Sequence, residues 1–372
     1  MTRKYVVCSR ARLILALVFA LAPQLSLADS FGQTNLVSDV RGLATTTDAN
    51  LKNAWGVSFS GTSPFWISNQ GTDTSTLYDG TGNAMSLVVG IPGGAPPSGP
   101  TGQVFNGTSG FVLPNGNPAH FIFDTLNGAI DGWNGGANAV QVSSTPGAVY
   151  TGLALANSGS SPYVYAADST GQIRVFDSTF KPVTLAGNFS DPKALPGYVP
   201  FNIQLLGSNL YVTYAQLTPQ GTGLPGGYID VFDTSGNFSK RLATGGPLYA
   251  PWGLTIAPLG FGSFGNDLLV GNFGNGEILA YDPSTGNYLS TIDGVNGSPI
   301  VNDFLWALEF RTGGANTSPN TLYFTAGINN QADGLFGAIT ATPEPDAGMF
   351  VIVGLSALAL AKLRRRPGGP IG

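Results

Sequence analysis

Residues 251–287 read "PWGLTIAPLGFGSFGNDLLVGNFGNGEILAYDPSTGN", and residues 54–83 read "AWGVSFSGTSPFWISNQGTDTSTLYDGTGN". Both segments open on Trp-Gly and a short apolar run, and both close on Tyr-Asp before a turn that contains Gly-Asn. Aligning the chain on this opening gives six copies, whose second residues are at positions 56, 102, 152, 202, 253 and 307. Successive copies are thus 46 to 54 residues apart. A period of about 40 to 50 residues with several strands per unit is typical of a β-propeller.

Each copy continues in the same way after its opening run. A second apolar run follows, such as "LYVTYA" from residue 210, and then a third that often ends in an aromatic residue and Asp, such as "YIDVFD" from residue 228. Turns such as "DTSGN" come next and supply the positive φ that tight hairpins need. A weaker fourth run closes most copies. Since one four-stranded blade cannot bury both of its faces, we predict an all-β fold, a six-bladed β-propeller of four-stranded blades.

The sixth copy lacks an outer strand, because "LFGAIT" from residue 335 runs directly into the C-terminal segment. At the other end of the chain, "TNLVSDV" at residues 34–40 is a strand without a blade. We therefore expect the N-terminal strand to close blade six and remove the free seam of the ring. Six blades without such a latch are the alternative.

Tryptophan recurs at the opening position of three copies, at Trp55, Trp252 and Trp306. An aromatic residue that repeats with the blade period favours packing between blades over a ligand platform. We interpret these three residues as core.

The N-terminal 28 residues have the composition of a signal peptide. A basic start precedes an apolar run, and small residues lie just before a cleavage site that we place between Ala28 and Asp29. Signal peptidase is the partner that this segment implies, and an uncleaved membrane anchor is the alternative. The sequence thus divides into a signal peptide at 1–28, a propeller at 29–341 and a C-terminal segment at 342–372.

The C-terminal segment has three parts in a fixed order. Pro343, Glu344 and Pro345 precede an apolar stretch at 347–361, and a basic cluster follows at Lys362, Arg364, Arg365 and Arg366. This order resembles the PEP-CTERM sorting signal of Gram-negative bacteria. The resemblance implies a transmembrane helix with its basic end in the cytoplasm and processing by an exosortase-type enzyme. Thr342 and the tail "PGGPIG" depart from the usual pattern, and an ordinary single-span anchor is the alternative.

The blade pattern resembles that of NHL-type six-bladed propellers. From about Asn35 to Thr340 the chain looks like an uncharacterised bacterial family of secreted propeller proteins with a PEP-CTERM signal. The stretches that carry this resemblance include "NLVSDVRGLATTTDANLKNAWGVSF" and "YAADSTGQIRVFDSTF". It implies a protein exported to the cell surface or extracellular matrix of a Gram-negative bacterium and transiently anchored in the inner membrane. It transfers no activity.

Charge and composition argue against several classes of binding and catalytic function. Residues 29–345 carry a net charge of −12, which disfavours binding to nucleic acid and to anionic lipid. The only cysteine, Cys8, lies in the leader, and the only histidine is His120. Thiol nucleophiles, clusters of His and Cys around a metal, and a Ser-His-Asp triad are therefore disfavoured. We interpret His120, which begins the second strand of blade two, as a solvated strand-end residue.

Candidate site residues lie where the innermost strands begin, since loops from all blades converge at the axis. Asn53, Asn202, Asn302 and Asp303 occupy such positions, and Glu309 lies on an innermost strand. Related six-bladed lactonases and gluconolactonases hold a divalent cation at the axis with Glu, Asn and Asp. The resemblance makes Asn53, Asn202, Asp303 and Glu309 candidate Ca²⁺ ligands. The alternative is that the Asn and Asp residues cap turns.

Three functions remain open from the sequence. We expect a binding or structural protein of the cell surface or matrix, without enzymatic activity or cofactor. Its expected partners are extracellular polysaccharide or surface proteins. The alternative is a Ca²⁺-dependent hydrolase of the lactonase type with its site at the axis. A third is a component of an exopolysaccharide layer that binds sugars through exposed aromatic residues.

Overall fold

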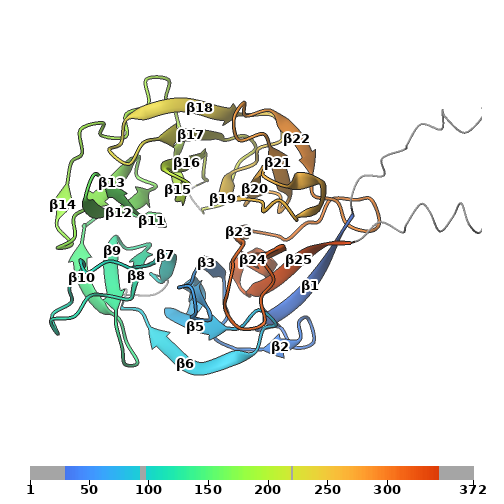
Figure 1. Ribbon diagram of the computed structural model, residues 1–372, viewed down its shortest axis with the longest axis horizontal. Coiled ribbons are helices and arrows are strands. Elements are labelled where there is room, and N and C mark those ends of the chain that lie inside the picture. Colours follow the sequence, from blue (N-terminus) through green and yellow to red (C-terminus); the bar gives the residue numbers. More distant parts are fainter. Residues whose placement is uncertain (1–29, 93–97, 219–220, 343–372) are drawn as a thin grey trace, which may run out of the picture.

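The computed structural model describes residues 30–92, 98–218 and 221–342, which form six β-sheets around a central axis (Figure 1). Blades one to five are four-stranded antiparallel sheets, and in each of them consecutive strands along the chain are neighbours in the sheet. This confirms the predicted six-bladed propeller. The first strand of each blade lies innermost, as the alignment on the Trp-Gly opening requires.

The strands of the first five blades follow the aligned copies. Blade one contains β3 (Ala54–Ser58), β4 (Phe65–Asn69), β5 (Thr74–Tyr78) and β6 (Ala84–Gly90). Blade two contains β7 (Pro100–Phe105), β8 (Phe121–Thr125), β9 (Ala129–Trp133) and β10 (Val140–Ser144). Blade three contains β11 (Tyr150–Ser158), β12 (Ser161–Asp168), β13 (Gln172–Phe176) and β14 (Pro182–Val183). Blade four contains β15 (Val199–Leu206), β16 (Asn209–Ala215), β17 (Tyr228–Phe232) and β18 (Phe238–Thr244). Blade five contains β19 (Pro251–Ile256), β20 (Leu268–Asn272), β21 (Ile278–Tyr281) and β22 (Tyr288–Thr291).

The sixth blade is built from both ends of the described chain. It contains β23 (Leu305–Glu309), β24 (Thr321–Ala326) and β25 (Leu335–Thr342), followed outward by β1 (Ser30–Ser38) and the short β2 (Thr46–Thr47). Three short helical turns lie between strands: η1 (Gln70–Thr72), η2 (Gly262–Phe264) and α1 (Ile328–Gln331).

The N-terminal strand latches the ring, as the sequence predicts. β1 pairs antiparallel with β25 along its whole length, from the pair Ser30 and Thr342 to the pair Ser38 and Leu335. The two ends of the described chain therefore leave the rim of the disc side by side (Figure 1). Because β1 occupies the edge of β25, blade six has an outer strand although its own chain segment supplies only three.

Close approach of the innermost strands explains the repeated glycine. A Cβ atom on Gly56 would lie 2.4 Å from the carbonyl oxygen of Thr101, and one on Gly102 would lie 2.3 Å from the nitrogen of Leu153. Both atoms belong to the innermost strand of the next blade. The second residue of the opening is therefore glycine in four copies, because only glycine admits a neighbouring backbone so close.

Each blade is buried on both faces because the next blade covers it. Between blades one and two, for example, the ring of Trp66 stacks on Phe121 with centroids 4.1 Å apart and meets Trp133 at 4.7 Å. Aliphatic and aromatic side chains fill the other spaces between blades in the same way. Burial of this apolar surface is the main stabilising contribution to the ring.

Several sequence predictions concern residues outside the described part of the chain. These are the cleavage site at Ala28 and Asp29, the motif Pro343–Pro345, the apolar stretch at 347–361 and the basic cluster that follows it. Within residues 30–342 as described, none of the helical segments has the length and apolar character needed to cross a bilayer.

Candidate binding cavity on the propeller axis

An aromatic cluster closes the axis at the end where the innermost strands begin. Trp55 from β3 and Trp306 from β23 are stacked, with ring centroids 3.5 Å apart, and Trp252 from β19 meets both of them edge-on. All three are at most 5% exposed. Phe201 and Phe273 pack against Trp306 from the fourth and fifth blades. The predicted packing role of the three tryptophans is confirmed.

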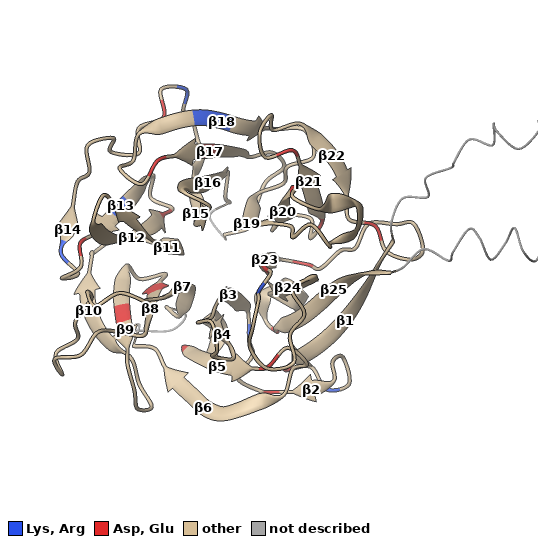
Figure 2. Cartoon of the chain, in the orientation of Figure 1, with Lys and Arg blue, Asp and Glu red and all other residues tan. Residues whose placement is uncertain are grey.

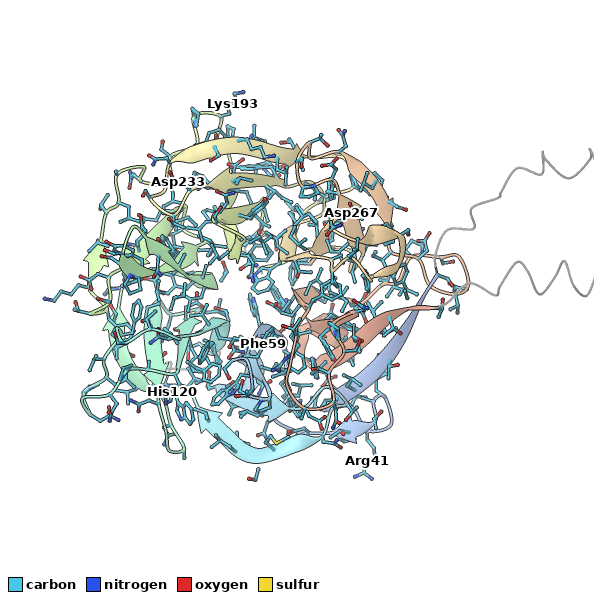
Figure 3. All side chains as sticks on the ribbon, in the orientation of Figure 1. Arg41, Phe59, His120, Lys193, Asp233 and Asp267 are labelled. Carbon is cyan, nitrogen blue, oxygen red and sulfur yellow. The ribbon has the colours of Figure 1, made fainter. Side chains whose placement is uncertain are left out.

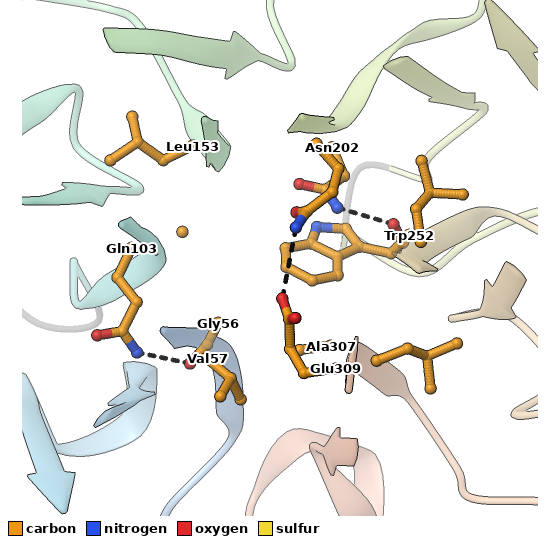
Figure 4. A pocket seen from close by; sticks show the side chains of 12 residues that line it. Gly56, Val57, Gln103, Leu153, Asn202, Trp252, Ala307 and Glu309 are labelled. Atoms are coloured by element: carbon orange, nitrogen blue, oxygen red, sulfur yellow. Dashed lines mark hydrogen bonds between the residues drawn. The ribbon is translucent and has the colours of Figure 1, made fainter. Parts of the chain in front are cut away.

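Hydrogen bonds hold this cluster in place. The Trp252 Nε1 donates to the carbonyl oxygen of Thr151 on the far side of the axis, at 2.8 Å. The Trp306 Nε1 donates to Asn53 Oδ1 at 2.9 Å. The indole of Trp252 therefore lies across the channel, as Figure 4 shows. The first bond joins blade five to blade three, and the second joins blade six to the start of blade one, so both tie innermost strands together at the axis.

Beyond the tryptophans the axis widens towards the opposite end. A narrow chamber of about 20 Å³ lies beside Trp252, which is room for about one water molecule. The chamber shares Val57, Gln103, Gln204 and Glu309 with an outer cavity of about 250 Å³. This volume approaches that of small-molecule sites. The axis is thus a blind funnel that opens where the innermost strands end.

Three polar side chains line both the chamber and the cavity. Gln204 Nε2 of β15 donates to Glu309 Oε1 of β23 across the axis, at 3.4 Å (Figure 4). Gln103 Nε2 of β7 donates to the carbonyl oxygens of Gly56 and Trp66, at 2.7 and 2.8 Å. The Gln103 Oε1 is buried and has no hydrogen-bond partner among the described residues. These groups supply both donors and acceptors to a ligand in the funnel.

Burial is the main influence on the protonation of the Glu309 carboxyl group. It raises the pKa of this carboxyl to about 8, and the hydrogen bond from Gln204 offsets only part of that effect. The side chain therefore retains a proton at neutral pH and can donate a hydrogen bond. The inner end of the funnel is accordingly polar and close to uncharged.

Phenylalanine side chains form part of the wall of the outer cavity. Phe59 follows β3 near the centre of the disc (Figure 3), and Phe105 ends β7 with 36% of its surface exposed. The Arg311 guanidinium lies over Phe59, 4.4 Å from the ring centroid, and donates to the carbonyl oxygens of Ser60 and Ser63. Arg311 thus fixes the loop that carries Phe59.

The structure does not bring the four candidate Ca²⁺ ligands together. Asn202 and Glu309 line the chamber, but Asn53 is not part of its lining and accepts a hydrogen bond from Trp306. Asp303 is exposed on the surface. The Asn53 amide also donates to Gln70 Oε1 at 2.8 Å, and the Asn202 amide donates to the carbonyl oxygen of Trp252 at 2.8 Å. Both amides thus serve to connect strands. Among the described residues, no three His, Cys, Asp or Glu side chains gather as metal ligands would.

Two other residues from the sequence analysis are placed by the structure. Asn302 is buried and exchanges two 2.9 Å hydrogen bonds with the side chain of Gln33 in the latch strand. His120 is exposed directly before β8, and its ring lies 6.4 Å from that of Trp133. Asn302 therefore connects blade six to its neighbour, and His120 is the surface strand-end residue that was expected.

Sequence reasoning missed Gln103 and Gln204. Both interrupt apolar innermost strands, "TGQVF" and "FNIQL", and such an interruption is the signal that could have found them. The candidates other than Glu309 lie near strand beginnings, and the aromatic cluster closes that end of the axis.

Comparison with known proteins identifies relatives of the whole propeller. The chain is 32% identical over 323 residues to "Uncharacterized protein R648" of Acanthamoeba polyphaga mimivirus, covering 82% of this chain and 78% of the relative. The chain belongs to the family of this viral protein. A second member, "Uncharacterized protein L690" of the same virus, is 31% identical over 325 residues, covering 82% of this chain and 84% of the relative. No family model matches the chain.

These relatives correct one expectation. The chain was expected to belong to a bacterial family of secreted propellers with a PEP-CTERM signal, but the family that the comparison shows is viral, and no comparison shows the sorting signal. Among solved structures, the chain resembles the soluble aldose sugar dehydrogenase of Escherichia coli. The TM-score is 0.51 at 12% identity, covering 84% of this chain and all of that one. At this identity the likeness supports the propeller fold alone.

Proposed function

We propose that this protein is an exported binding protein without enzymatic activity, which holds a small, uncharged, hydroxyl-rich ligand of the sugar class in its axial funnel. The observation that carries the proposal is the convergence of Gln103, Gln204 and Glu309 on a cavity of about 250 Å³ that is closed at one end. A blind cavity with a few fixed polar groups on an otherwise apolar wall is the usual form of a small-molecule site.

The polar groups match a polyol better than an ion. Two amides and a protonated carboxyl offer paired donors and acceptors without a net charge, and vicinal hydroxyl groups need that arrangement. Phe59 and Phe105 add apolar ring surface at the wall, on which the C–H face of a sugar ring can pack. The net charge of −12 on residues 29–345 disfavours anionic ligands.

The lining of the funnel does not support hydrolysis. Glu309 is its only carboxyl group, and neither a second titratable group nor a nucleophile activated by a base lines the described cavity. General acid–base chemistry on a glycosidic or ester bond usually needs two such groups. We therefore favour binding over the Ca²⁺-dependent hydrolase.

Export rests on the composition of residues 1–28, a basic start and an apolar run that end in small residues. Extracellular polysaccharide is then the accessible source of the ligand. Mass analysis of the secreted protein tests this part, because a mature N-terminus at Asp29 is expected. A chain that keeps residues 1–28 and stays inside the cell contradicts it.

Titration calorimetry with a panel of neutral mono- and disaccharides tests the binding function on the full-length chain. We expect saturable binding of at least one sugar and about tenfold weaker binding in Gln204→Ala, since one neutral hydrogen bond is lost. Asp303→Ala, on the exposed surface outside the funnel, serves as the control and should bind like the wild type. Absence of binding by the wild type, or equal affinity in Gln204→Ala, contradicts the proposal.

A further inference from the structure

Asp131, in the third strand of blade two, is a buried carboxyl group without a hydrogen-bond partner in the described part of the chain. It is 0% exposed, and neither of its carboxylate oxygens has a hydrogen-bond partner among the described residues. Burying an ionised carboxylate without a compensating charge or hydrogen bond is strongly unfavourable. A native protein has to offset such a cost with a proton, an ion or a cationic side chain.

The register of the sheet places this carboxylate between blades one and two. Asp131 pairs with Phe123 across β8 and β9 and lies two residues before Trp133 in the same strand, so the three side chains share one face. That face packs on blade one, because Trp66 of β4 contacts Trp133 at 4.7 Å. Phe123 and Trp66 belong to the same interblade cluster.

Blade one contributes two hydroxyl groups to the same interface. Ser68 and Ser75 face each other in the pairing of β4 with β5. They lie two residues from Trp66 and Leu77, respectively, and therefore on the face that meets blade two. Both are 0% exposed, and neither hydroxyl has a hydrogen-bond partner among the described residues. Three polar side chains from two blades are thus buried at one interface, and no hydrogen bond joins them.

Another blade shows how the fold neutralises an acid at this position. Asp230 is the equivalent of Asp131 in blade four, in "YIDVF" against "AIDGW", and Arg241 opposite it donates from Nε at 2.9 Å. In blade two the residue opposite Asp131 is Gln141, which is exposed. Figure 2 shows the difference, with acidic residues on β8 and β9 and the basic segment on β18.

No basic side chain of the surrounding chain can take the place of Arg241. The sequence has no Lys or Arg from residue 53 to residue 173, a span that contains blades one and two entirely. A second buried carboxyl group lies close by in the chain, and Asp124 of β8 also has one oxygen without a hydrogen-bond partner among the described residues. Burial and the charge of Asp124 raise the pKa of Asp131 to about 8, which shows how unfavourable the uncompensated ion is.

We propose that the interface between blades one and two binds an alkali-metal cation, Na⁺ or K⁺, through the Asp131 carboxylate and the hydroxyls of Ser68 and Ser75. The ligand set is all oxygen, which suits a hard cation. The Asp131 carboxylate carries the one formal negative charge of this set, and a monovalent cation balances it. A proton on Asp131 would neutralise the charge, but it would not connect the carboxylate to the hydroxyl oxygens of Ser68 and Ser75. A cation can contact the oxygens of all three side chains. The cation cross-links two blades and is a structural part of the ring.

Thermal unfolding of the full-length chain tests the site in sodium, potassium and choline chloride at one ionic strength and pH 7.5. We expect the Tm of the wild type to rise with Na⁺ or K⁺ by about 2 °C for each tenfold increase above the dissociation constant. Asp131→Asn should show no difference among the three salts. Asp282→Asn removes a partly exposed turn carboxylate of blade five, away from this interface, and serves as the control, with the cation response of the wild type.

Two further measurements keep the test decisive if Asp131→Asn does not fold. Ser68→Ala combined with Ser75→Ala keeps the carboxylate and should reduce the cation response. In crystals soaked in Rb⁺ or Tl⁺, we expect an anomalous peak between these three residues. Equal wild-type Tm in all three salts, a cation response that persists in Asp131→Asn, or no peak overturns the proposal. A fall in Tm between pH 5 and pH 8 that is equal in all salts and is lost in Asp131→Asn identifies a proton bound at Asp131, and it also overturns the proposal.

Discussion

The indole rings of Trp55 and Trp306 are stacked face to face, with centroids 3.5 Å apart and planes 16° from parallel. One ring comes from the first complete blade and the other from the last, so the stack spans the junction at which the propeller closes. The same pair, together with Trp252, closes one end of the axis. A single contact therefore contributes both to the stability of the ring and to the shape of the funnel.

Replacement of Trp306 should destabilise the whole disc. Trp306→Ala removes a side chain that is 1% exposed and contacts four aromatic rings, so we expect the free energy of unfolding to fall by about 3 to 5 kcal/mol. Urea unfolding followed by tryptophan fluorescence measures the change. Tyr288→Ala, at an exposed position of β22, should change it by less than about 1 kcal/mol. Equal effects of the two substitutions would show that the aromatic cluster contributes little.

The latch depends on Phe31 more than on the exposed side chains of β1. Phe31 is 1% exposed and meets the rings of Phe261 and Phe264 at 4.9 and 5.6 Å, so it anchors β1 to blade five. We expect Phe31→Ala to cost about 3 kcal/mol and to speed hydrogen exchange in β25, the strand that β1 covers. Thr34→Ala, at an exposed position of the same strand, is the control. Unchanged exchange in β25 after Phe31→Ala would argue against a latch held by this residue.

A methyl group at Gly102 has no room. Its Cβ would lie 2.3 Å from the backbone nitrogen of Leu153, and backbone atoms cannot rotate away as a side chain can. We predict that Gly102→Ala costs about 1 to 3 kcal/mol or more through overpacking. Gly61→Ala is the matched control, because nothing lies within 4 Å of the added atom. The midpoints of chemical unfolding compare the two variants, and equal midpoints contradict the close approach of the innermost strands.

Stability should depend on pH through Glu309. In the unfolded chain this carboxyl ionises near its ordinary value of 4.5, whereas burial in the folded chain raises its pKa to about 8. Folding therefore binds a proton between these values, and the corresponding stability is lost as pH rises from the lower value to the upper. Glu309→Gln cannot ionise, so at pH 8 we expect it to be more stable than the wild type by on the order of 2 kcal/mol. This is less than the full shift implies, because the side chain is only half-buried.

The measurement is the free energy of unfolding of both proteins from pH 4 to pH 9. The difference between them should be small near pH 4 and should grow up to about pH 8. A difference that does not change with pH would show that Glu309 ionises at its ordinary value. Sugar affinity should weaken over the upper part of the same range, since the ligand then meets a charged carboxylate in place of a hydrogen-bond donor.

Part of the candidate site could be read from the sequence. The sequence places Glu309 on an innermost strand as a candidate ligand at the axis, and this residue does line the funnel. Gln103 and Gln204 were overlooked, although each is a polar residue within an apolar innermost strand. Asp131 is also visible in the alignment of the third strands, and the absence of Lys and Arg around it could have indicated an uncompensated charge.

The number of blades, the strands within each blade and the closing role of β1 can all be predicted from the sequence. These features follow from apolar runs and turn residues, which act over a few residues, and from the recurrence of this pattern six times along the chain. The three-dimensional arrangement is needed to show which end of the axis is closed, which polar side chains meet in the funnel and which buried carboxyl group has no hydrogen-bond partner among the described residues. Those outcomes depend on contacts between blades that lie 50 to 250 residues apart in the chain, such as Asn202 with Trp252 and Asn53 with Trp306, and no local pattern encodes them.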